Sequence, residues 1–355
     1  MPIVDSQDSR LDEVMSERLS QRFISEDGLY LDTSLEMSPH LLISVDHMLD
    51  WFNHLEEIAA QPLGRRLAHA SADHETWRQN RRTTPLPKGI FSKRKRIPWL
   101  LEDWSERGLG LLSVQSEGRI SVEKQIQSAM AGGQGAGAWE VLQGSRFRFR
   151  WEQHDASRTD IILEPDSRQA HPPRKVTGVW IDRARADAKL TFPAVDKHDS
   201  GWEVDGRRSF MLGRDLILRL EDEILPHTKN KFDDGTLILD LEDEARVAVW
   251  NIFARAEKQA FIDGGEHVMI ADTEHWEGVA MTFFSRTGHG ELKLCKSCDS
   301  HGGVELTFKS SFHPALLTGR VMACWQRAYG RQPRAEWRQD EGLHIIRVCS
   351  RHEIA

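Results

Sequence analysis

The feature that most constrains this chain is a long-range repeat within its 355 residues. The first copy reads GAGAWEVLQGSRFRFRWEQ from Gly135 to Gln153, and the second reads GRVMACWQRAYGRQPRAEWRQ from Gly319 to Gln339. A shift of 186 residues places Trp139 on Trp325, Gly144 on Gly330 and Trp151 on Trp337. Trp is a scarce residue, and a period of this size is the length of a domain rather than of a solenoid repeat. The sequence therefore predicts an internal duplication of a whole domain.

The similarity continues on both sides of the best-matched stretch. Upstream, Gly108-Leu109-Gly110 corresponds to Gly288-His289-Gly290, and GRISV from Gly118 corresponds to GGVEL from Gly302. Trp51 to Trp77 and Trp250 to Trp276 are equal in length and end in ADHETW and ADTEHW. We interpret these two segments as equivalent helical regions that precede the repeat.

Hydrophobic periodicity predicts the same element order in both copies, with helices first and then an antiparallel sheet interrupted by one helix. The fold class expected is α+β, with two homologous domains whose N-terminal helices pack on an antiparallel sheet. The first copy is expected to span residues 1–165, the linker 166–209 and the second copy 210–355. Expected helices cover residues 39–60, 65–77, 129–142, 242–261 and 314–329, and expected strands cover residues 111–115, 120–126, 146–152, 159–163, 291–294, 304–309, 334–338 and 343–348.

Bulk properties exclude several classes of protein. The net charge of −8 gives no global case for nucleic-acid binding, which needs a basic face. The four cysteines all lie in the second copy and do not form a disulfide framework, and no apolar run approaches the roughly 20 residues that span a bilayer. We expect a cytoplasmic protein without a membrane span.

A strongly basic segment interrupts the first copy. The stretch from Arg78 to Arg96 carries eight basic residues and no acidic one, and its two prolines and one glycine predict a loop. Such a loop is typical of a solvated insertion, and it is also able to bind nucleic acid or another polyanion. The candidate polyanion-binding residues are Arg81, Arg82, Lys93, Arg94, Lys95 and Arg96.

The second copy holds one arrangement of possible metal ligands. Cys295, Cys298 and His301 form a Cys-x-x-Cys-x-x-His sequence, which offers three zinc ligands at workable spacing. A fourth ligand could come from His313, Cys324, Cys349 or His352. A redox dithiol and a polar hairpin with incidental cysteines are the alternatives, since no second paired motif accompanies this one.

The order of these elements resembles the 4-vinyl reductase domain family of small-molecule-binding domains. The resemblance is carried by Leu63-Gly64-Arg65-Arg66-Leu67-Ala68, by the helix, glycines and strand from Trp104 to Val114, and by the helix ending Tyr-Gly-Arg within Ser310 to Arg331. It implies a ligand sensor or carrier, and it implies dimerisation through this domain. Two copies in one chain then form a pseudo-dimer, and the protein can be a monomer because its dimer is internal. The family's zinc site maps onto His313 and Glu336 here, with Gln339 where a Cys is expected.

We expect a non-catalytic protein that binds a small apolar or aromatic molecule, because no nucleophile triad or phosphate-binding glycine loop is present. The first copy has a Gly- and Ala-rich central helix that lets helix and sheet approach closely, so the ligand cavity is expected in the second copy. A scaffold protein that binds a polyanion through the basic loop is the alternative, and a reductase is suggested by the family name alone. The expected cavity lies between helix and sheet, and its expected lining is Leu294, Leu306, Phe308, Leu317, Val321 and Trp325.

Overall fold

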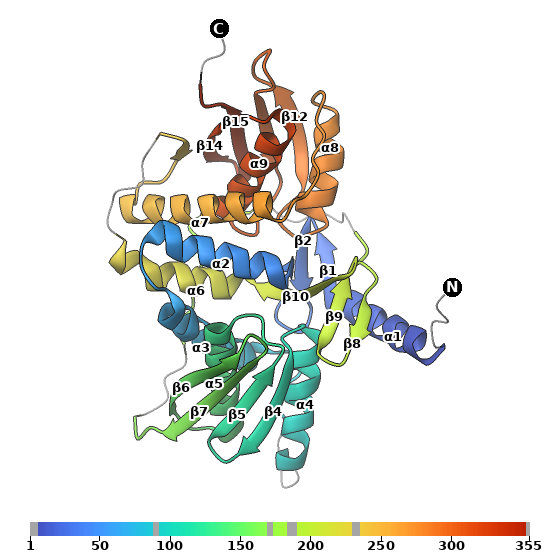
Figure 1. Cartoon of the computed structure of the whole chain (residues 1–355), viewed down its shortest axis with the longest axis vertical. Helices are drawn as coiled ribbons and strands as arrows, with labels where there is room; N and C mark the ends of the chain where they lie inside the picture. Colours follow the sequence, from blue (N-terminus) through green and yellow to red (C-terminus); the bar gives the residue numbers. More distant parts are fainter. Residues whose placement is uncertain (1–5, 88–91, 169–172, 183–189, 229–234, 353–355) are drawn as a thin grey trace.

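The computed structural model describes residues 6–87, 92–168, 173–182, 190–228 and 235–352. A sheet-and-helix unit from each copy lies at either end of the long axis, and a layer that both copies build lies between them (Figure 1). One apolar core runs through both halves, and a smaller one lies beneath the N-terminal helix α1 (Ser6–Arg22). The fold is α+β with antiparallel sheets, as the sequence predicts. Within the described part of the chain, no helix is long and apolar enough to cross a membrane.

The two end units have the same order of elements. In the first unit, the four strands follow the order β4-β5-β7-β6, and helix α5 covers one face of the sheet. In the second unit, the matching order is β12-β13-β15-β14, and helix α9 covers the sheet. A short strand, β11, extends the second sheet by pairing in parallel with β14. The first unit comprises β4 (Leu111–Ser116), β5 (Arg119–Glu123), α5 (Ser128–Gln143), β6 (Phe147–Asp155) and β7 (Arg158–Pro165). The second comprises β11 (Leu237–Leu239), β12 (Leu292–Ser297), β13 (Val304–Phe308), α9 (Pro314–Tyr329), β14 (Pro333–Asp340) and β15 (Leu343–Ser350).

The repeated residues occupy matching elements. Trp139 lies in α5 and Trp325 in α9, while Trp151 lies in β6 and Trp337 in β14. Both helices end at a glycine in the left-handed conformation, at φ 69° for Gly144 and 65° for Gly330. Glycine adopts this conformation without the steric cost of a Cβ atom, so it ends the helix at the same place in both copies.

A close helix crossing fixes each end unit to its neighbour. Helix α5 crosses α3 (Gly64–Arg81), and helix α9 crosses α7 (Glu244–Asp263). A Cβ atom at Gly133 would lie 2.0 Å from the carbonyl oxygen of Ala68, and one at Gly319 would lie 2.2 Å from that of Ala254. Both residue pairs keep the 186-residue shift, so α3 corresponds to α7.

The central layer contains a six-stranded sheet to which both halves contribute. Its order is β1-β2-β3-β10-β9-β8, and β3 pairs with β10 antiparallel at its middle. Helix α2 (Val45–Ala59) follows β3 and packs on α7, whereas α6 (Arg214–Ile224) follows β10 and packs on α3. The strands are β1 (Phe23–Glu26), β2 (Leu29–Asp32), β3 (Ser38–Ser44), β8 (Asp196–His198), β9 (Gly201–Val204) and β10 (Arg207–Gly213).

One sequence-based helix boundary is wrong for a tertiary reason. The helix expected over residues 39–60 begins only at Val45, because Leu41 to Ile43 pair with Phe210 to Leu212 of β10. The expected linker 166–209 contains β8, β9 and the start of β10, which pair with one another as consecutive hairpins. Residue patterns report local periodicity, whereas β3 and β10 form by pairing with each other across more than 150 residues. The pairing of the Trp51 segment with the Trp250 segment is also wrong, because Trp51 lies in α2 and Trp250 in α7.

The basic segment is less of a loop than expected. Helix α3 continues through Arg81, and helix α4 (Ser92–Glu106) begins before the last basic residues. Pro98 lies inside α4, and residues 88–91 lie outside the described part of the chain. Arg78, the first basic residue of the segment, is fully buried rather than solvated.

The helix crossings generate a stability prediction. We expect Gly319→Ala to lower the free energy of unfolding by about 1–3 kcal/mol, because the added methyl group meets the Ala254 carbonyl and forces α9 away from α7. Gly278→Ala is the matched control, since nothing lies within 4 Å of its Cβ position and alanine favours a helix. Urea unfolding of both variants measures the difference. Equal unfolding midpoints for the two variants would contradict the close-crossing interpretation.

Candidate functional site

A cavity of about 560 Å³ lies between the two halves of the molecule. One wall comes from β3, the start of α2 and strands β9 and β10 of the central layer. The opposite wall comes from the second copy, at the end of α7, the π-helical turn η2 (Met281–Ser285) and α9. We call this space the interface cavity. Its lining is Leu42, Ile43, Ser44, Asp46, His47, Asp50, Val204, Asp205, Arg207, Ser209, Phe261, Gly264, Glu266, Thr282, Phe283, Arg286, Thr287 and Arg320.

Three charged or polar side chains from different elements meet at one side of the interface cavity. Glu257 of α7 accepts from Arg320 Nε of α9 at 2.7 Å, and its carboxylate lies 3.0 Å from His47 Nε2 of α2. The side chains of Glu257 and Arg320 are 3% and 7% exposed. Burial opposes ionisation of Glu257, but the charge of Arg320 and the contact with His47 hold the pKa of its carboxyl well below its ordinary value. Glu257 therefore stays ionised and joins the two halves through α2, α7 and α9.

His289 extends this cluster. Its side chain is 1% exposed, its Nδ1 lies 2.9 Å from Thr287 Oγ1, and its Nε2 lies 4.0 Å from a Glu257 oxygen. Its Nε2 has no hydrogen-bond partner among the described residues. Burial and the neighbouring charge of Arg320 lower the pKa of His289 well below its ordinary value, so the ring is neutral.

The first copy has no such cluster at the equivalent positions. The shifts that align the repeats place Ser71 at the position of Glu257, Gln134 at that of Arg320 and Leu109 at that of His289. All three are buried. Glu257, Arg320 and His289 therefore have no charged or histidine counterpart in the first copy.

The corresponding space in the first copy is filled by its own ion pairs. Glu75, Arg78 and Arg107 take the positions of Phe261, Gly264 and Thr287, which line the cavity in the second copy. Arg107 contacts Glu75 at 2.9 Å and Arg78 contacts it at 3.2 Å, and each of these side chains is at most 2% exposed. Asp103 joins both arginines, and Arg22 joins Asp103 at 3.0 Å. Although burial opposes its ionisation, these arginines lower the pKa of Glu75 to about 2.

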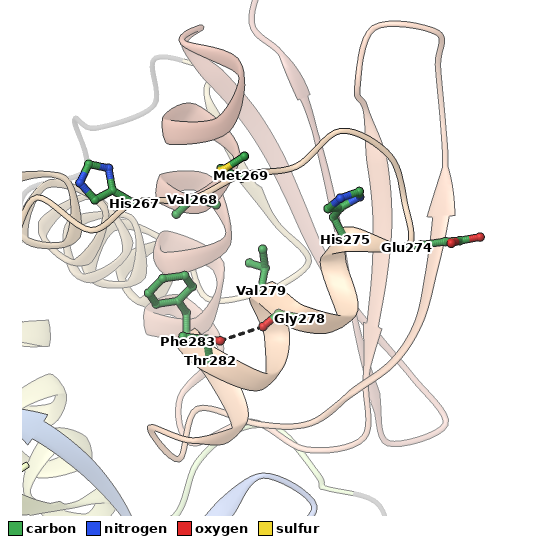
Figure 2. A pocket seen from close by; sticks show the side chains of 9 residues that line it. All are labelled: His267, Val268, Met269, Glu274, His275, Gly278, Val279, Thr282 and Phe283. Carbon is green, nitrogen blue, oxygen red and sulfur yellow. Dashed lines mark hydrogen bonds between the residues drawn. The ribbon is translucent and has the colours of Figure 1, made fainter. Parts of the chain in front are cut away.

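A second, shallower groove lies beside helix α8 (His275–Ala280), and Figure 2 shows it between this helix and the chain that carries His267 to Met269. Its volume is about 580 Å³. Val268, Val279 and Phe283 supply its apolar side chains, and Thr282 is bound to the Gly278 carbonyl at 2.9 Å. Phe283 and Thr282 line the interface cavity as well, so η2 separates the two spaces.

The apolar residues expected to line a ligand cavity lie elsewhere. Leu294 is 43% exposed and lines a smaller cavity of about 210 Å³ beside β12. The other five are 0% exposed and belong to the packed core, and none of them lines the three cavities described above. The indole nitrogen of Trp325 donates to the Gly302 carbonyl at 2.8 Å, which fixes that ring against the hairpin. These five residues are Leu306, Phe308, Leu317, Val321 and Trp325.

The expected metal ligands do not converge. Cys295 lies on β12, while the backbone of Cys298 and His301 forms turn contacts with Gly303 and Asp299. Among the described residues, no group of three His, Cys, Asp or Glu side chains is arranged to hold a metal ion. Burial raises the pKa of Cys295 to about 11, so without a metal its sulfur is a thiol at neutral pH.

The zinc positions implied by the family resemblance do not fit either. Both ring nitrogens of His313 are engaged, one with Glu221 at 3.2 Å and one with the Ala315 amide at 3.2 Å. Glu336 lies 3.7 Å from Arg334 on the sheet, and Gln339 binds the backbone of Ile181 in the segment that joins the copies. His313 and Gln339 therefore already have partners within the fold, and these positions form no metal-binding group among the described residues.

Several arginines of the basic segment form contacts within the fold. Arg82 lies 2.6 Å from Asp103 with its guanidinium over the Trp99 ring, and Arg96 donates to the carbonyls of Pro87 and Leu142. Arg81 contacts Glu36 at 3.1 Å and Lys95 is exposed. The side chains of Lys93 and Arg94 lie outside the described part of the structure.

Sequence reasoning missed His47, Glu257 and Arg320. Each lies in a helix; Glu257 and Arg320 are charged residues at buried positions, whereas His47 is half-buried. Alignment of the two copies offers a signal. Glu257 aligns with Ser71 and Arg320 aligns with Gln134, so a charged residue in the second copy replaces a neutral one in the first. His289 is distinctive in the sequence because it lies between two glycines and aligns with Leu109 of the first copy.

Comparison with known proteins gave no matching family model, no matching curated protein and no matching solved structure. The site must therefore be interpreted from its own geometry.

The buried histidines generate a pH prediction. Burial lowers the pKa of His40 to about 4 and also lowers those of His74, His289 and His313. The unfolded chain binds protons at these positions below about pH 6.5, whereas the native chain does not. The free energy of unfolding should therefore be highest above pH 6.5 and fall as the pH drops toward 4.

Urea unfolding between pH 8 and pH 5 measures this dependence. His40→Asn keeps a donor for the Ser38 carbonyl, which His40 Nδ1 contacts at 2.9 Å, but it removes the titrating ring. We expect this variant to lose less stability than the wild type between pH 6.5 and 5. An unfolding midpoint that stays constant over this range in the wild type would contradict the prediction.

Proposed function

We propose that this protein is a non-catalytic sensor or carrier that binds one small molecule per chain in the interface cavity. The observation that carries this proposal is the difference between the two copies at matching positions. Glu75, Arg78 and Arg107 fill the space in the first copy, whereas Phe261, Gly264 and Thr287 leave a space of about 560 Å³ in the second. This volume falls within the ~300–1,000 Å³ typical of small-molecule sites.

The lining suits an organic molecule with an apolar body and a polar end. The rings of Phe261 and Phe283 pack edge to face with centroids 5.2 Å apart, and Leu42 and Ile43 add aliphatic surface. The Glu257, Arg320 and His47 cluster supplies polar groups at fixed positions. Twelve of the eighteen lining residues are polar or charged, so the cavity offers one aromatic and aliphatic wall beside many oriented polar groups, which fix the orientation of a ligand.

The proposal retains the interpretation of the chain as a covalent dimer of 4-vinyl reductase-like domains. The supporting observations are the strand order of the central sheet, the pairing of β3 with β10 and the reciprocal packing of α2 on α7 and of α6 on α3. An approximate two-fold axis between β3 and β10 accounts for all three. The ligand site then lies beside a domain interface, where cavities are common.

Thiol reactivity gives no support for a catalytic role. Burial raises the pKa of Cys295 to about 11, and it also raises those of Cys298, Cys324 and Cys349. All four sulfurs are therefore predominantly protonated near neutral pH and are weak nucleophiles.

Closing the cavity tests the proposal. Gly264 has φ −60° at the end of α7, so an arginine fits its backbone without strain and restores the residue type of Arg78. We expect Gly264→Arg to reduce ligand affinity at least tenfold, because its side chain occupies the cavity. A panel of small aromatic compounds, including cations, anions and neutral molecules, would be screened by thermal shift and then by calorimetry.

Gly278→Leu is the matched control. It adds a side chain to the groove of Figure 2, and nothing lies within 4 Å of its Cβ position. Binding should survive this change with a stoichiometry of one ligand per chain. Binding that survives Gly264→Arg, or the absence of any ligand in the panel, would overturn the proposed function.

A further inference from the structure

The arginines that line the interface cavity are already neutralised. Arg320 contacts Glu257 at 2.6 Å, Arg286 contacts Asp205 at 3.2 Å, and Arg207 is paired with Glu266. The pair of Arg320 with Glu257 is buried, and an anion near Arg286 or Arg207 competes with the carboxylate that each of them already contacts. A carboxylate or phosphate would therefore gain little from this cavity.

Two carboxylates of the lining are not neutralised in this way. Asp46 and Asp50 lie one turn apart on α2, and within the described ranges neither forms an ion pair within 4 Å. Arg208 is close enough to interact electrostatically with Asp46, but its guanidinium donates to the Lys124 carbonyl. With Glu257 included, five carboxylates face three arginines around this space. The local charge balance is negative.

The hydrogen bonds of His289 add an independent sign of the same preference. Thr287 Oγ1 lies 2.8 Å from the Phe283 carbonyl, to which its hydroxyl must donate, so it accepts from His289 Nδ1 at 2.9 Å. The neutral ring then presents a lone pair at Nε2, which has no donor among the described residues. This buried acceptor lies 4.0 Å from a Glu257 oxygen, and His289 itself lies behind Thr287, which lines the cavity. The Glu257 carboxylate and this lone pair make the region behind the cavity wall electronegative, which favours a ligand that donates hydrogen bonds.

The aromatic wall is also compatible with positive charge. The Arg320 guanidinium carbon lies 5.5 Å from the centre of the Phe261 ring, so a cation already lies against this wall. Aromatic faces attract cations through their quadrupole. Phe283 packs against the same ring and lines the cavity, and it offers a second aromatic surface.

We propose that the interface cavity selects an organic cation, an ammonium group carried on an apolar body about the size of one aromatic ring. The ammonium lies toward Asp46, Asp50 and the Glu257 cluster, and the apolar body lies against Phe261 and Phe283. This inference rests on the proposed function and adds the chemical class of the ligand.

Three probes of nearly equal size test the sign of the charge. They are 2-phenylethylamine as the cation, 3-phenylpropionate as the anion and 2-phenylethanol as the neutral molecule. We expect calorimetry at pH 7 to give at least tenfold tighter binding for the amine than for the carboxylate, with the alcohol between them. Added salt should weaken the binding of the amine more than that of the alcohol, because salt screens the attraction between charges.

Two variants, each of which removes one negative charge, test where the ammonium group binds. Asp50→Asn should weaken amine binding about fivefold and leave alcohol binding unchanged. Asp222→Asn is the control. Asp222 lies on α6, pairs with Arg174 and does not line the cavity. Its replacement changes the net charge of the protein by the same amount as Asp50→Asn. An equal effect of both variants on amine binding would contradict a direct role for Asp50.

The outcomes separate this inference from the proposed function. Carboxylate or alcohol binding that equals or exceeds amine binding overturns the choice of a cation and leaves a small-molecule site in place. Failure of the amine to bind, when the aromatic panel contains another ligand that Gly264→Arg excludes, also overturns it. If neither the amine nor any panel compound binds, both the inference and the proposed function fail.

Discussion

The antiparallel pairing of β3 with β10 is the interaction on which the rest of the architecture depends. It joins segments more than 150 residues apart and builds one sheet from both copies. Because α2 and α6 follow these strands directly, the pairing also decides where both helices lie. Each helix then packs on the long helix of the opposite copy. The interface cavity is a consequence, since its walls are β3, α2 and β10 on one side and the second copy on the other.

The same location in the two copies shows two ways to bury charge. In the first copy, Glu75, Asp103, Arg78 and Arg107 neutralise one another and fill the available volume. In the second, Glu257 is neutralised by Arg320 and contacted by His47, and aromatic or small residues occupy the remaining positions. A buried ion pair is costly unless every member is paired, so neither arrangement tolerates the loss of one partner.

Several residues that the sequence suggests for a metal site or a basic binding loop have partners within the fold instead. His313 caps helix α9 and contacts Glu221, while Gln339 holds the backbone of Ile181 in the connecting segment. Arg78 begins a stretch that looked solvated, yet its guanidinium is completely buried. Residue type and spacing identify what a side chain is able to do, but its partners decide what it does.

The sequence by itself determined the repeated unit. The spacing of Trp139 and Trp325 and of Gly144 and Gly330 placed the central helix, its end and the following strand correctly in both copies, because these depend on local periodicity and on the left-handed glycine. The fold class followed from the same pattern. The tertiary structure alone decided that Leu41 to Ile43 form a strand, that residues 196–209 belong to the central sheet, and that His47, Glu257 and Arg320 meet. These outcomes depend on contacts between segments far apart in the chain, and the free energy of such contacts has no local signature in the residues that make them.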